Sequence, residues 1–238
     1  MADMEKALTN AGVLLDKDAV ARLNLYHDLL LDWNTRMDLT SVSQQDMARR
    51  HFVDSLLPLS QQAYFPLNAR LIDVGTGAGF PGLALAAARP DLTVTLLEAQ
   101  GKRCQFLRAV IDALQLKNAR VIQDRAEVLG HLEEHREAYD LATARAVAPM
   151  NVLCEYLLPF VKPGGRALCW KGPAAVEELT DGAFAACALG GRLEETVEMF
   201  EGENRHVLVP VIKTEKTLPQ YPRKNGIPVK RPLRLGKK

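Results

Sequence analysis

The segment Leu71-Ile-Asp-Val-Gly-Thr-Gly-Ala-Gly-Phe-Pro-Gly82 contains the most informative pattern in this chain. An apolar strand runs into a turn dense in glycine, and Pro81 then begins a helix, because proline fits the first helical turn, where its missing N–H is not needed. Glycine lets the backbone turn sharply and lets a ligand approach it closely, and the N–H groups at the start of the helix attract an anion or a polar ligand edge. The stretch therefore predicts a ligand site at the end of a strand.

The glycines also fit a known spacing. Gly77, Gly79 and Gly82 satisfy G-x-G-x-x-G, a pattern shared by dinucleotide enzymes and methyltransferases. Glu98 closes the next apolar run, 23 residues after Gly75, where a carboxylate can accept hydrogen bonds from both ribose hydroxyls of an adenosine. NAD and S-adenosylmethionine both contain that ribose, so these residues indicate adenosine without choosing between the two cofactors.

The form of the loop favours S-adenosylmethionine. Asp73 lies inside the strand end, a position suited to the ammonium-bearing part of a methionine. The stretch Val161-Lys-Pro-Gly-Gly-Arg166 precedes the fifth strand, as in many methyltransferases, and Asp124-Arg-Ala-Glu127 follows the third strand, where such enzymes meet the adenine. We therefore expect S-adenosylmethionine as the cofactor, bound by a loop that includes Asp73, Gly75, Gly77 and Gly79.

From residue 69 onward, short apolar runs alternate with helical stretches, which is typical of βαβ units on a parallel sheet. The predicted strands are Arg70–Val74, Thr93–Glu98, Arg120–Gln123, Asp140–Ala144 and Arg166–Trp170, with helices that begin near Pro81, Lys102, Glu127, Pro149 and Ala174. Two more β-type runs, Arg192–Phe200 and His206–Thr214, are joined by the polar turn Glu201–Asn204. The pattern predicts a doubly wound, Rossmann-like α/β fold with a seven-stranded, mostly parallel sheet that ends in an antiparallel hairpin, the arrangement of class I methyltransferases.

We divide the chain into an N-terminal helical cap (1–60), the Rossmann-like domain (61–214) and a basic, proline-rich tail (215–238). In the cap, Asp16 can begin a helix whose apolar positions recur at spacings of three and four. Ser43, with Asp46 three residues later, predicts a second helix start.

The net charge of +1 hides an asymmetry. Residues 213–238 hold nine Lys and Arg and one acid, so the tail carries +8 and residues 1–212 carry −7. Such a tail predicts contact with a polyanion, because each neutralised phosphate releases counterions. Its four prolines should hold it extended and keep it from forming a helix, and a disordered, solubilising end is the alternative.

Several classes of protein are not indicated. The apolar runs fall short of the roughly 20 residues of a membrane helix, and the N-terminus lacks a secretory pattern, so we expect a cytoplasmic protein. His131-Leu-Glu-Glu-His135 fits an inverted zinc-peptidase pattern, but it offers no third ligand, so we expect a solvated helix face and no metal. Four widely spaced cysteines, predicted to be buried and reduced, are Cys104, Cys154, Cys169 and Cys187.

Across about residues 20–232, the chain resembles the small-subunit (16S) ribosomal RNA guanine-N7 methyltransferases (RsmG, also called glucose-inhibited division protein B). The segments that carry the resemblance are Trp33–Thr40, Arg50–Ser55, Asp73–Gly82, Gly101–Arg103, Arg125–Glu127, Ala144–Ala146, Lys171–Gly172 and Tyr221–Gly226. Asp38 departs from the family, which usually has Asn there.

The resemblance implies methyl transfer from S-adenosylmethionine to N7 of a guanine in 16S rRNA. It implies cofactor contacts from Gly75, Gly77, Phe80, Glu98, Ala126, Glu127 and Arg145. It also implies an RNA-binding side built from the N-terminal segments and the tail, for which the candidates are Arg50, Lys171, Arg223, Lys224, Lys230 and Arg231.

Guanine N7 presents an unprotonated lone pair, so the transfer needs alignment and desolvation more than a general base. The fourth strand ends in Thr143-Ala-Arg-Ala146 and lacks the Asn-Pro-Pro-aromatic motif of amino-group methyltransferases. Arg145 is the catalytic candidate. A bidentate grip on guanine O6 and N7 would cover the nucleophile, which leaves O6 alone, a phosphate or the methionine carboxylate as its partner, with a structural salt bridge as the alternative.

Other basic and acidic side chains lie near the predicted strand ends. Lys171 could contact an RNA phosphate or be a solvated lysine. Arg50, His51 and Asp54 share one helix turn at the mouth of the pocket, where His51 and Asp54 are expected to pair and dock the cap.

Two other functions remain open from the sequence. An NAD-dependent oxidoreductase would need a catalytic His or a Tyr-Lys pair near the strand ends, and Tyr139 and Tyr156 lack that setting. A non-catalytic RNA-binding assembly factor would not need the intact Gly75–Gly82 loop and Glu98. We expect a monomer.

Overall fold

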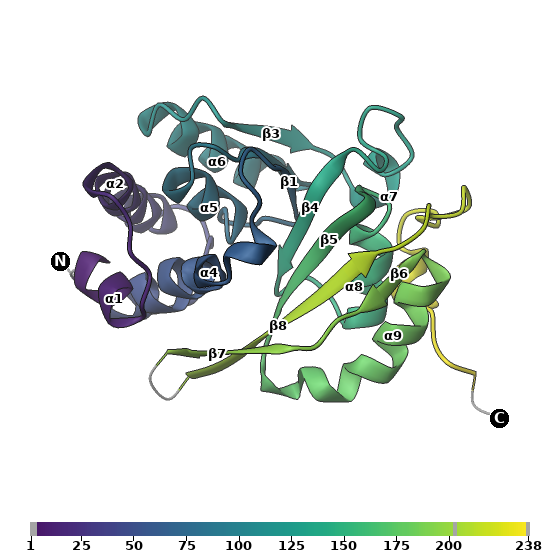
Figure 1. The fold of residues 1–238 in the computed structure, drawn as a ribbon. Coiled ribbons are helices and arrows are strands. Elements are labelled where there is room, and N and C mark those ends of the chain that lie inside the picture. Colours follow the sequence, from purple (N-terminus) through teal and green to yellow (C-terminus); the bar gives the residue numbers. More distant parts are fainter. Residues whose placement is uncertain (1–3, 202–203, 237–238) are drawn as a thin grey trace.

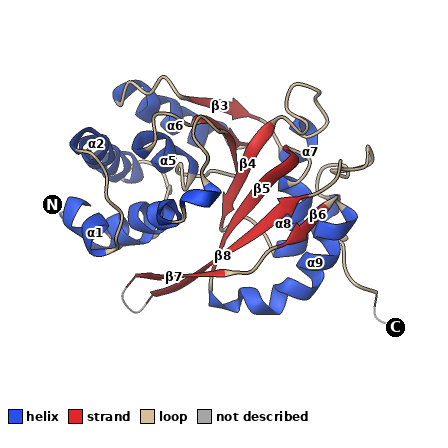
Figure 2. Cartoon of the chain, viewed as in Figure 1, coloured by secondary structure: helices blue, strands red, loops and turns tan. Residues whose placement is uncertain are grey.

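A single mixed sheet runs through the molecule, with helices on both of its faces (Figures 1 and 2). The computed structural model describes residues 4–201 and 204–236. The strands are β1 (Arg70–Val74), β2 (Thr93–Glu98), β3 (Ala119–Gln123), β4 (Tyr139–Arg145), β5 (Val161–Lys171), β6 (Gly191–Leu193), β7 (Val197–Glu201) and β8 (Asn204–Lys213). Their order is β3-β2-β1-β4-β5-β8-β6, with β7 paired to β8. Strands β1 to β5 are parallel and β8 is antiparallel to β5, which confirms the predicted doubly wound sheet.

Successive side chains along each strand point to opposite faces of the sheet. Leu71 and Leu141 belong to the apolar cluster beneath the N-terminal helices, whereas Ile72 and Ala142 belong to the cluster on the other face. The first face carries α1 (Met4–Asn10), α2 (Lys17–Asn34), α3 (Gln44–Met47), α4 (Asp54–Leu56), α5 (Gly82–Ala88) and α6 (Gly101–Ala113). The second carries α7 (Ala126–Leu129), α8 (Met150–Leu157) and α9 (Leu179–Ala188).

The N-terminal helices begin where the sequence predicts. Asp16 accepts a hydrogen bond from the backbone N–H of Ala19 at 2.6 Å, and Ser43 caps α3 through the N–H of Asp46 at 3.2 Å. Helix α3 continues into a π-helix, Ala48–Val53, and two 3-10 turns follow α4, Leu57–Ser60 and Gln62–Tyr64. Every residue of α5 is buried, because this helix lies between the sheet and the cap.

The predicted strand Arg192–Phe200 is divided into β6 and β7, so the described residues form eight strands and not the seven predicted. Leu193 pairs with Val211 and Val197 pairs with Leu208, which places three residues (194–196) opposite two (209–210). An extra residue of this kind interrupts a ladder, and Pro210 also has no N–H to donate. Residues 202–203 of the predicted turn lie outside the described residues.

The prediction that prolines exclude a helix from the tail is wrong. A short helix, α10 (Ile227–Lys230), contains Pro228 in its first turn, where no N–H is needed. The preceding segment is also docked on the domain, since Arg136 donates hydrogen bonds to the carbonyl groups of Thr217, Leu218 and Tyr221.

Two local predictions also need correction. The connection from His131 to His135 is a series of turns, in which His131 Nε2 bonds to the carbonyl of Pro222 and buried His135 bonds to the hydroxyl of Tyr139. It is therefore not a solvated helix face. Cys187 is exposed, whereas the other three cysteines are buried. Within residues 4–201 and 204–236, no three His, Cys, Asp or Glu side chains are grouped as metal ligands, and no helix combines the length and apolarity needed to cross a bilayer.

The turn after β1 predicts a difference between two glycine substitutions. Gly79 and Gly164 have φ angles of 96° and 88°, so alanine should cost about 1 kcal/mol at either position. A Cβ at Gly79 would also meet the Tyr26 hydroxyl and Leu83 Cβ, whereas a Cβ at Gly164 has no atom within 4 Å. We expect Gly79→Ala to lower the free energy of unfolding by about 1–3 kcal/mol more than Gly164→Ala in urea titrations. Equal losses in the free energy of unfolding for the two variants would contradict a clash of the added Cβ with Tyr26 and Leu83.

Candidate active site

The loop after β1 is built for close approach to the backbone. Gly75, Gly77 and Gly79 all have positive φ angles, of 69°, 60° and 96°, which side-chain-bearing residues rarely adopt. Asp73 is fully buried below them, where it accepts hydrogen bonds from the N–H of Gly82 at 2.9 Å and the hydroxyl of Thr143 at 2.7 Å. Burial raises the pKa of Asp73. One carboxylate oxygen thus holds the strand end to the start of α5 and the other holds it to β4, and the expected contact with a methionine ammonium group stays a prediction.

Glu98 lies beside this loop at the end of β2. Its carboxylate accepts hydrogen bonds from the N–H of Gly77 at 2.9 Å and of Gln100 at 2.8 Å. Because β1 and β2 are parallel neighbours, their carboxyl ends meet at one edge of the sheet, and the predicted ribose ligand and the glycine loop come together there.

Ala126 and Glu127, predicted to meet the adenine, begin α7 after the third strand at the same edge, and both are buried. Glu127 Oε1 accepts hydrogen bonds from the N–H of Gly226 at 3.0 Å and from the hydroxyl of Tyr156 at 3.4 Å. The candidate adenine contact is therefore in direct contact with the C-terminal tail.

Tyr26 of α2 is a site residue that the sequence analysis missed. Its hydroxyl donates to the carbonyl of Ala78 inside the glycine loop, and its ring stacks on Phe80 with centroids 5.3 Å apart. Burial raises the pKa of Tyr26 well above its ordinary value, so the hydroxyl remains a donor. Its helical spacing places Tyr26 on the buried face and a buried hydroxyl requires a partner, but nothing in the sequence identifies Ala78 as that partner.

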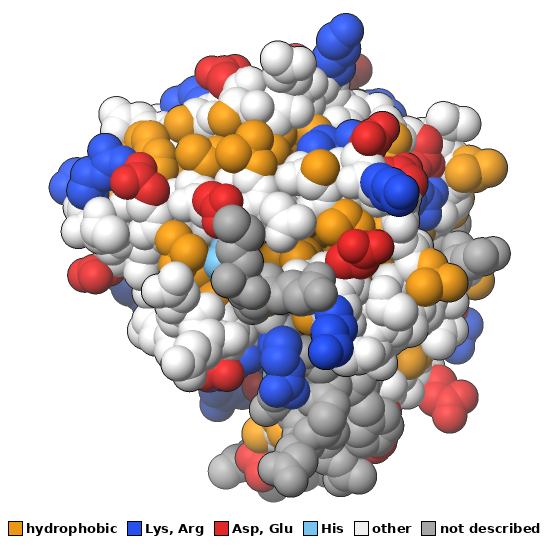
Figure 3. All heavy atoms as spheres, turned by 90° about the vertical axis from the view of Figure 1, so that its left-hand side faces the viewer, with side chains coloured by type: hydrophobic (Ala, Val, Ile, Leu, Met, Phe, Trp, Pro, Cys, Tyr) orange, Lys and Arg blue, Asp and Glu red, His pale blue; other side chains and the backbone are white. Residues whose placement is uncertain are grey.

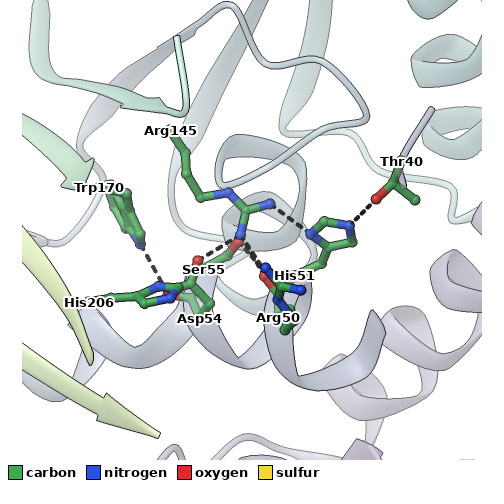
Figure 4. Close-up of polar contacts among 8 residues, drawn as sticks. All are labelled: Thr40, Arg50, His51, Asp54, Ser55, Arg145, Trp170 and His206. Atoms are coloured by element: carbon green, nitrogen blue, oxygen red, sulfur yellow. Dashed lines mark hydrogen bonds and ion pairs between the residues drawn. The ribbon is translucent and has the colours of Figure 1, made fainter. Parts of the chain in front are cut away.

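Arg145, the catalytic candidate, lies at the end of β4 and is held by the cap (Figure 4). Its guanidinium donates to Asp54 Oδ2 at 2.7 Å, to the carbonyl of Arg50 at 3.0 Å and to His51 Nδ1 at 3.0 Å. It also lies over the ring of Phe80, 5.1 Å from the centroid. The structural salt bridge considered from the sequence is present, and it places Arg145 in the wall of a cavity.

The π-helix Ala48–Val53 explains how the cap reaches Arg145. The N–H of Asp54 bonds back to the carbonyl of Arg49, five residues earlier. The carbonyl of Arg50 accepts from Arg145, and that of His51 accepts from the hydroxyl of Ser55 at 2.5 Å. π-helical turns are frequent at functional sites. This one directs Arg50, His51 and Asp54 toward Arg145 at the end of β4.

Asp54 joins the cap to three strands. Its carboxylate binds Arg145 of β4 and His206 of β8, and its backbone carbonyl accepts from Trp170 of β5 at 3.0 Å (Figure 4). Burial opposes ionisation, but His206 and Arg145 outweigh it and hold the pKa of Asp54 below its ordinary value. The expected His51–Asp54 pair is absent from the described contacts, and His206 was not identified because its hairpin partner lies far away in sequence.

His51 is neutral. Burial and the charge of Arg145 lower its pKa to about 4. Because Arg145 can only donate, Nδ1 of His51 must accept, so Nε2 carries the proton and donates to Thr40 Oγ1 at 2.6 Å. The ring also stacks on Phe80, with centroids 4.7 Å apart.

These residues surround a cavity of about 300 Å³. It is lined by Val42, Arg50, His51, Asp54, Arg145, Ala146, Trp170, Lys171, Gly172 and His206. Lys171 is neither solvated nor free, because it pairs with Glu178 at 2.6 Å and donates to the carbonyl of Ala148 at 3.1 Å. Arg50 has an exposed side chain at this cavity.

The remaining RNA-binding candidates lie in the tail. Lys224, Lys230 and Arg231 are exposed. Arg223 differs from them, since its guanidinium pairs with buried Glu155 at 2.6 Å.

The low pKa of His51 predicts acid sensitivity. Between pH 6.5 and about 4 the unfolded chain binds a proton at His51 that the folded protein does not, so stability falls as pH falls through this window. We expect the wild type to lose on the order of 2 kcal/mol more than His51→Gln between pH 7 and pH 5, measured by urea unfolding. Other histidines contribute equally to both proteins, and parallel pH curves would contradict the assignment.

Comparisons with known proteins agree with this geometry. Residues 19–208 match the GidB family, described as rRNA small subunit methyltransferase G. A ribosomal RNA small subunit methyltransferase G from Alkaliphilus metalliredigens is 42% identical over 226 residues, which covers 94% of each chain. The enzyme of that name from Symbiobacterium thermophilum is 43% identical over 238 residues, which covers 97% of this chain and 96% of the relative.

Solved structures share the fold at low identity. A mutant of MtNAS in complex with S-adenosylmethionine matches with a TM-score of 0.55 and 19% identity, over 90% of this chain and 84% of that chain. A 16S rRNA adenine-N1 methyltransferase mutant from Catenulisporales acidiphilia matches with a TM-score of 0.52 and 15% identity, over 67% of this chain and 91% of that chain. Together with the sequence matches along nearly the whole chain, the fold leads to one conclusion: this chain belongs to the rRNA small subunit methyltransferase G family.

Proposed function

We propose that this protein transfers the methyl group of S-adenosylmethionine to N7 of one guanine in the 16S rRNA of the small ribosomal subunit. One observation carries the proposal: the glycine loop, Glu98 and Glu127 follow three adjacent parallel strands, and Arg145 follows a fourth beside a cavity. Membership of the family supports this function over an NAD-dependent oxidoreductase or a non-catalytic assembly factor. The cytoplasmic location and the monomeric state stay predictions.

The residues at this edge fit S-adenosylmethionine. The carboxylate of Glu98 is ordered by two backbone N–H groups, which suits it to accept hydrogen bonds from a ribose. The three glycines with positive φ place no Cβ atom at three positions of the loop, and Ala126 with Glu127 would border the adenine. When bound, this cofactor supplies an electrophilic methyl group on its sulfonium.

The cavity would receive the guanine. Arg145 is fixed in the cavity wall by Asp54 and by the π-helix, so it needs no reordering to orient the acceptor. Its partner would be O6 alone or a phosphate of the acceptor RNA, or else the methionine carboxylate of the cofactor, and each of these keeps N7 open. His51 is neutral and bonded at both nitrogens, and Asp54 is ionised and paired. The proposed chemistry uses neither as a base, because N7 has no proton to remove.

The RNA contacts proposed here come from exposed cations, namely Arg50, Lys224, Lys230 and Arg231. On the face of the helical cap, acidic and basic side chains are interspersed among apolar ones (Figure 3). A surface of mixed charge gives little general attraction to phosphate, so the tail is the main electrostatic contact in this proposal.

The decisive experiment supplies labelled S-adenosylmethionine and small ribosomal subunits that lack the modification. We expect label in the 16S rRNA and chain scission at one guanine after the chemical treatment that cleaves at N7-methylguanine. Label on a different base atom would keep the enzyme class and overturn the assigned acceptor. Absence of label, with the protein folded and the subunits intact, would overturn the function.

Glu98 provides a test of the cofactor site alone. Glu98→Gln keeps the size of the side chain but removes the charge that strengthens hydrogen bonds to the ribose. We expect S-adenosylhomocysteine to bind about tenfold more weakly, a loss of about 1.4 kcal/mol, measured by isothermal titration calorimetry. Asp112→Asn, on the exposed side of α6, is the matched control and should leave the dissociation constant unchanged. Equal constants for Glu98→Gln and the wild type would remove Glu98 from the site.

A further inference from the structure

The tail segment 217–226 is fastened to the domain by side chains of the connection between α7 and β4. Arg136 donates to the carbonyl groups of Thr217 at 2.8 Å, Leu218 at 3.0 Å and Tyr221 at 2.7 Å. His131 Nε2 bonds to the next carbonyl, that of Pro222, at 2.6 Å. Four backbone carbonyls of one short segment are therefore held by two side chains, which fixes the path of the tail.

Arg223 pins this path to α8. Its Nε and Nη2 atoms donate to Oε1 and Oε2 of Glu155 at 2.9 and 2.6 Å, and its backbone N–H donates to Oε1 at 2.8 Å. The side chain of Glu155 is 0% exposed, so without Arg223 it would be a buried and unpaired charge, which is strongly destabilising. Arg223 is thus bound to an internal partner, unlike its exposed neighbour Lys224.

Three residues beyond Arg223, the tail contacts the candidate adenine residue. Gly226 adopts a φ of 76°, which favours glycine, and its N–H donates to Glu127 Oε1 at 3.0 Å. Tyr156, next to Glu155 on α8, donates to the same oxygen at 3.4 Å. Both donors converge on Oε1, and Oε2 takes no hydrogen bond among the residues that the structure describes.

We propose that the segment 217–226 is a clasp that sets the orientation of the Glu127 carboxylate for the amino group of adenine, with Arg223 as its positioning residue. The proposal rests on the proposed function, because it requires the adenosine-containing cofactor at this edge. One oxygen of Glu127 is held by the tail, which leaves the other to accept a hydrogen bond from an exocyclic amine. Hypoxanthine has a carbonyl oxygen in place of that amine and would face the carboxylate with a like partial charge.

The clasp also couples the binding of RNA to the binding of the cofactor. Lys224 and Lys230 flank Gly226 and are exposed, so phosphate contacts to them would stabilise the docked tail and, through Gly226, the oriented Glu127. Coupling of binding free energies is reciprocal, so the cofactor would in turn stabilise the docked tail for RNA.

Hydrogen exchange on the full-length wild-type protein tests the clasp without a substitution. We expect S-adenosylhomocysteine to slow exchange in peptides covering residues 217–230 as well as in those covering the Gly75–Phe80 loop. Slowed exchange in the loop alone would overturn the clasp and leave the proposed function intact. A protein that binds no S-adenosylhomocysteine would instead contradict the proposed function.

A second test uses base discrimination, which a merely structural role of Arg223 would not change. Binding of S-adenosylhomocysteine and of S-inosylhomocysteine is compared by calorimetry in the wild type and in the double variant Arg223→Met with Glu155→Met, which leaves no unpaired buried charge. We expect the wild type to prefer the adenine compound by about tenfold or more, and the double variant to lose most of that preference. An unchanged ratio, even with both ligands weakened, would overturn the proposal.

Lys224→Gln is the matched control. It should keep the wild-type preference for adenine while it weakens RNA binding and lowers the dependence of log affinity on log salt by about one phosphate contact. Loss of the adenine preference in this control would show that tail charge, and not the Arg223–Glu155 pin, sets the site, and would overturn the role of Arg223. Urea unfolding checks the fold of each variant, and where the double variant does not fold the hydrogen-exchange result decides.

Discussion

The buried carboxylate of Asp54 is the interaction on which the active-site edge depends. Its side chain is 4% exposed, and its two oxygens are both occupied, one by the guanidinium of Arg145 of β4 and the other by the imidazole of His206 of β8. Removing one partner of such a group leaves a charge in a poorly solvated place, which is more costly than the pair is stabilising. If the cap shifted away from the sheet, Asp54 would become exposed or would lose its partners while still buried. The cavity wall between the cap and the sheet therefore keeps its shape.

The same cap also holds the cofactor loop, so the N-terminal helices are part of the site and not an appendage to it. Tyr26 bonds to the carbonyl of Ala78, and its ring, with those of Phe52 and His51, surrounds Phe80. Asp73 fastens the other side of the loop to α5. A loop with three positive φ angles has high conformational freedom in the unfolded chain, and these contacts hold it in the one conformation that the site requires.

Local patterns were sufficient to predict the parallel part of the sheet, because each βα unit is encoded by its own apolar run and the turn that follows it. They also placed cofactor candidates at the ends of the first three strands, and the structure brings these ends, with Asp73, Glu98 and Glu127, to one edge of the sheet. Contacts between distant segments could not be predicted in this way. Nothing near Arg223 indicates Glu155, 68 residues earlier, and nothing near Asp54 indicates His206, 152 residues later. The division of Arg192–Phe200 likewise depends on its register with β8.

The distribution of ion pairs changes what the basic tail means. Composition alone assigns its nine cations to a polyanion, but Lys213 is buried beside Glu137 and Arg223 is paired with buried Glu155. Burial lowers the pKa of Lys213 to about 8, as expected for a cation that serves packing within the domain. Charges that neutralise internal acids release no counterions when RNA binds, so they add nothing to the salt dependence of binding. The paired cations give the tail its position, and under the proposed function that position would determine where the exposed cations, Lys224, Lys230 and Arg231, meet the RNA.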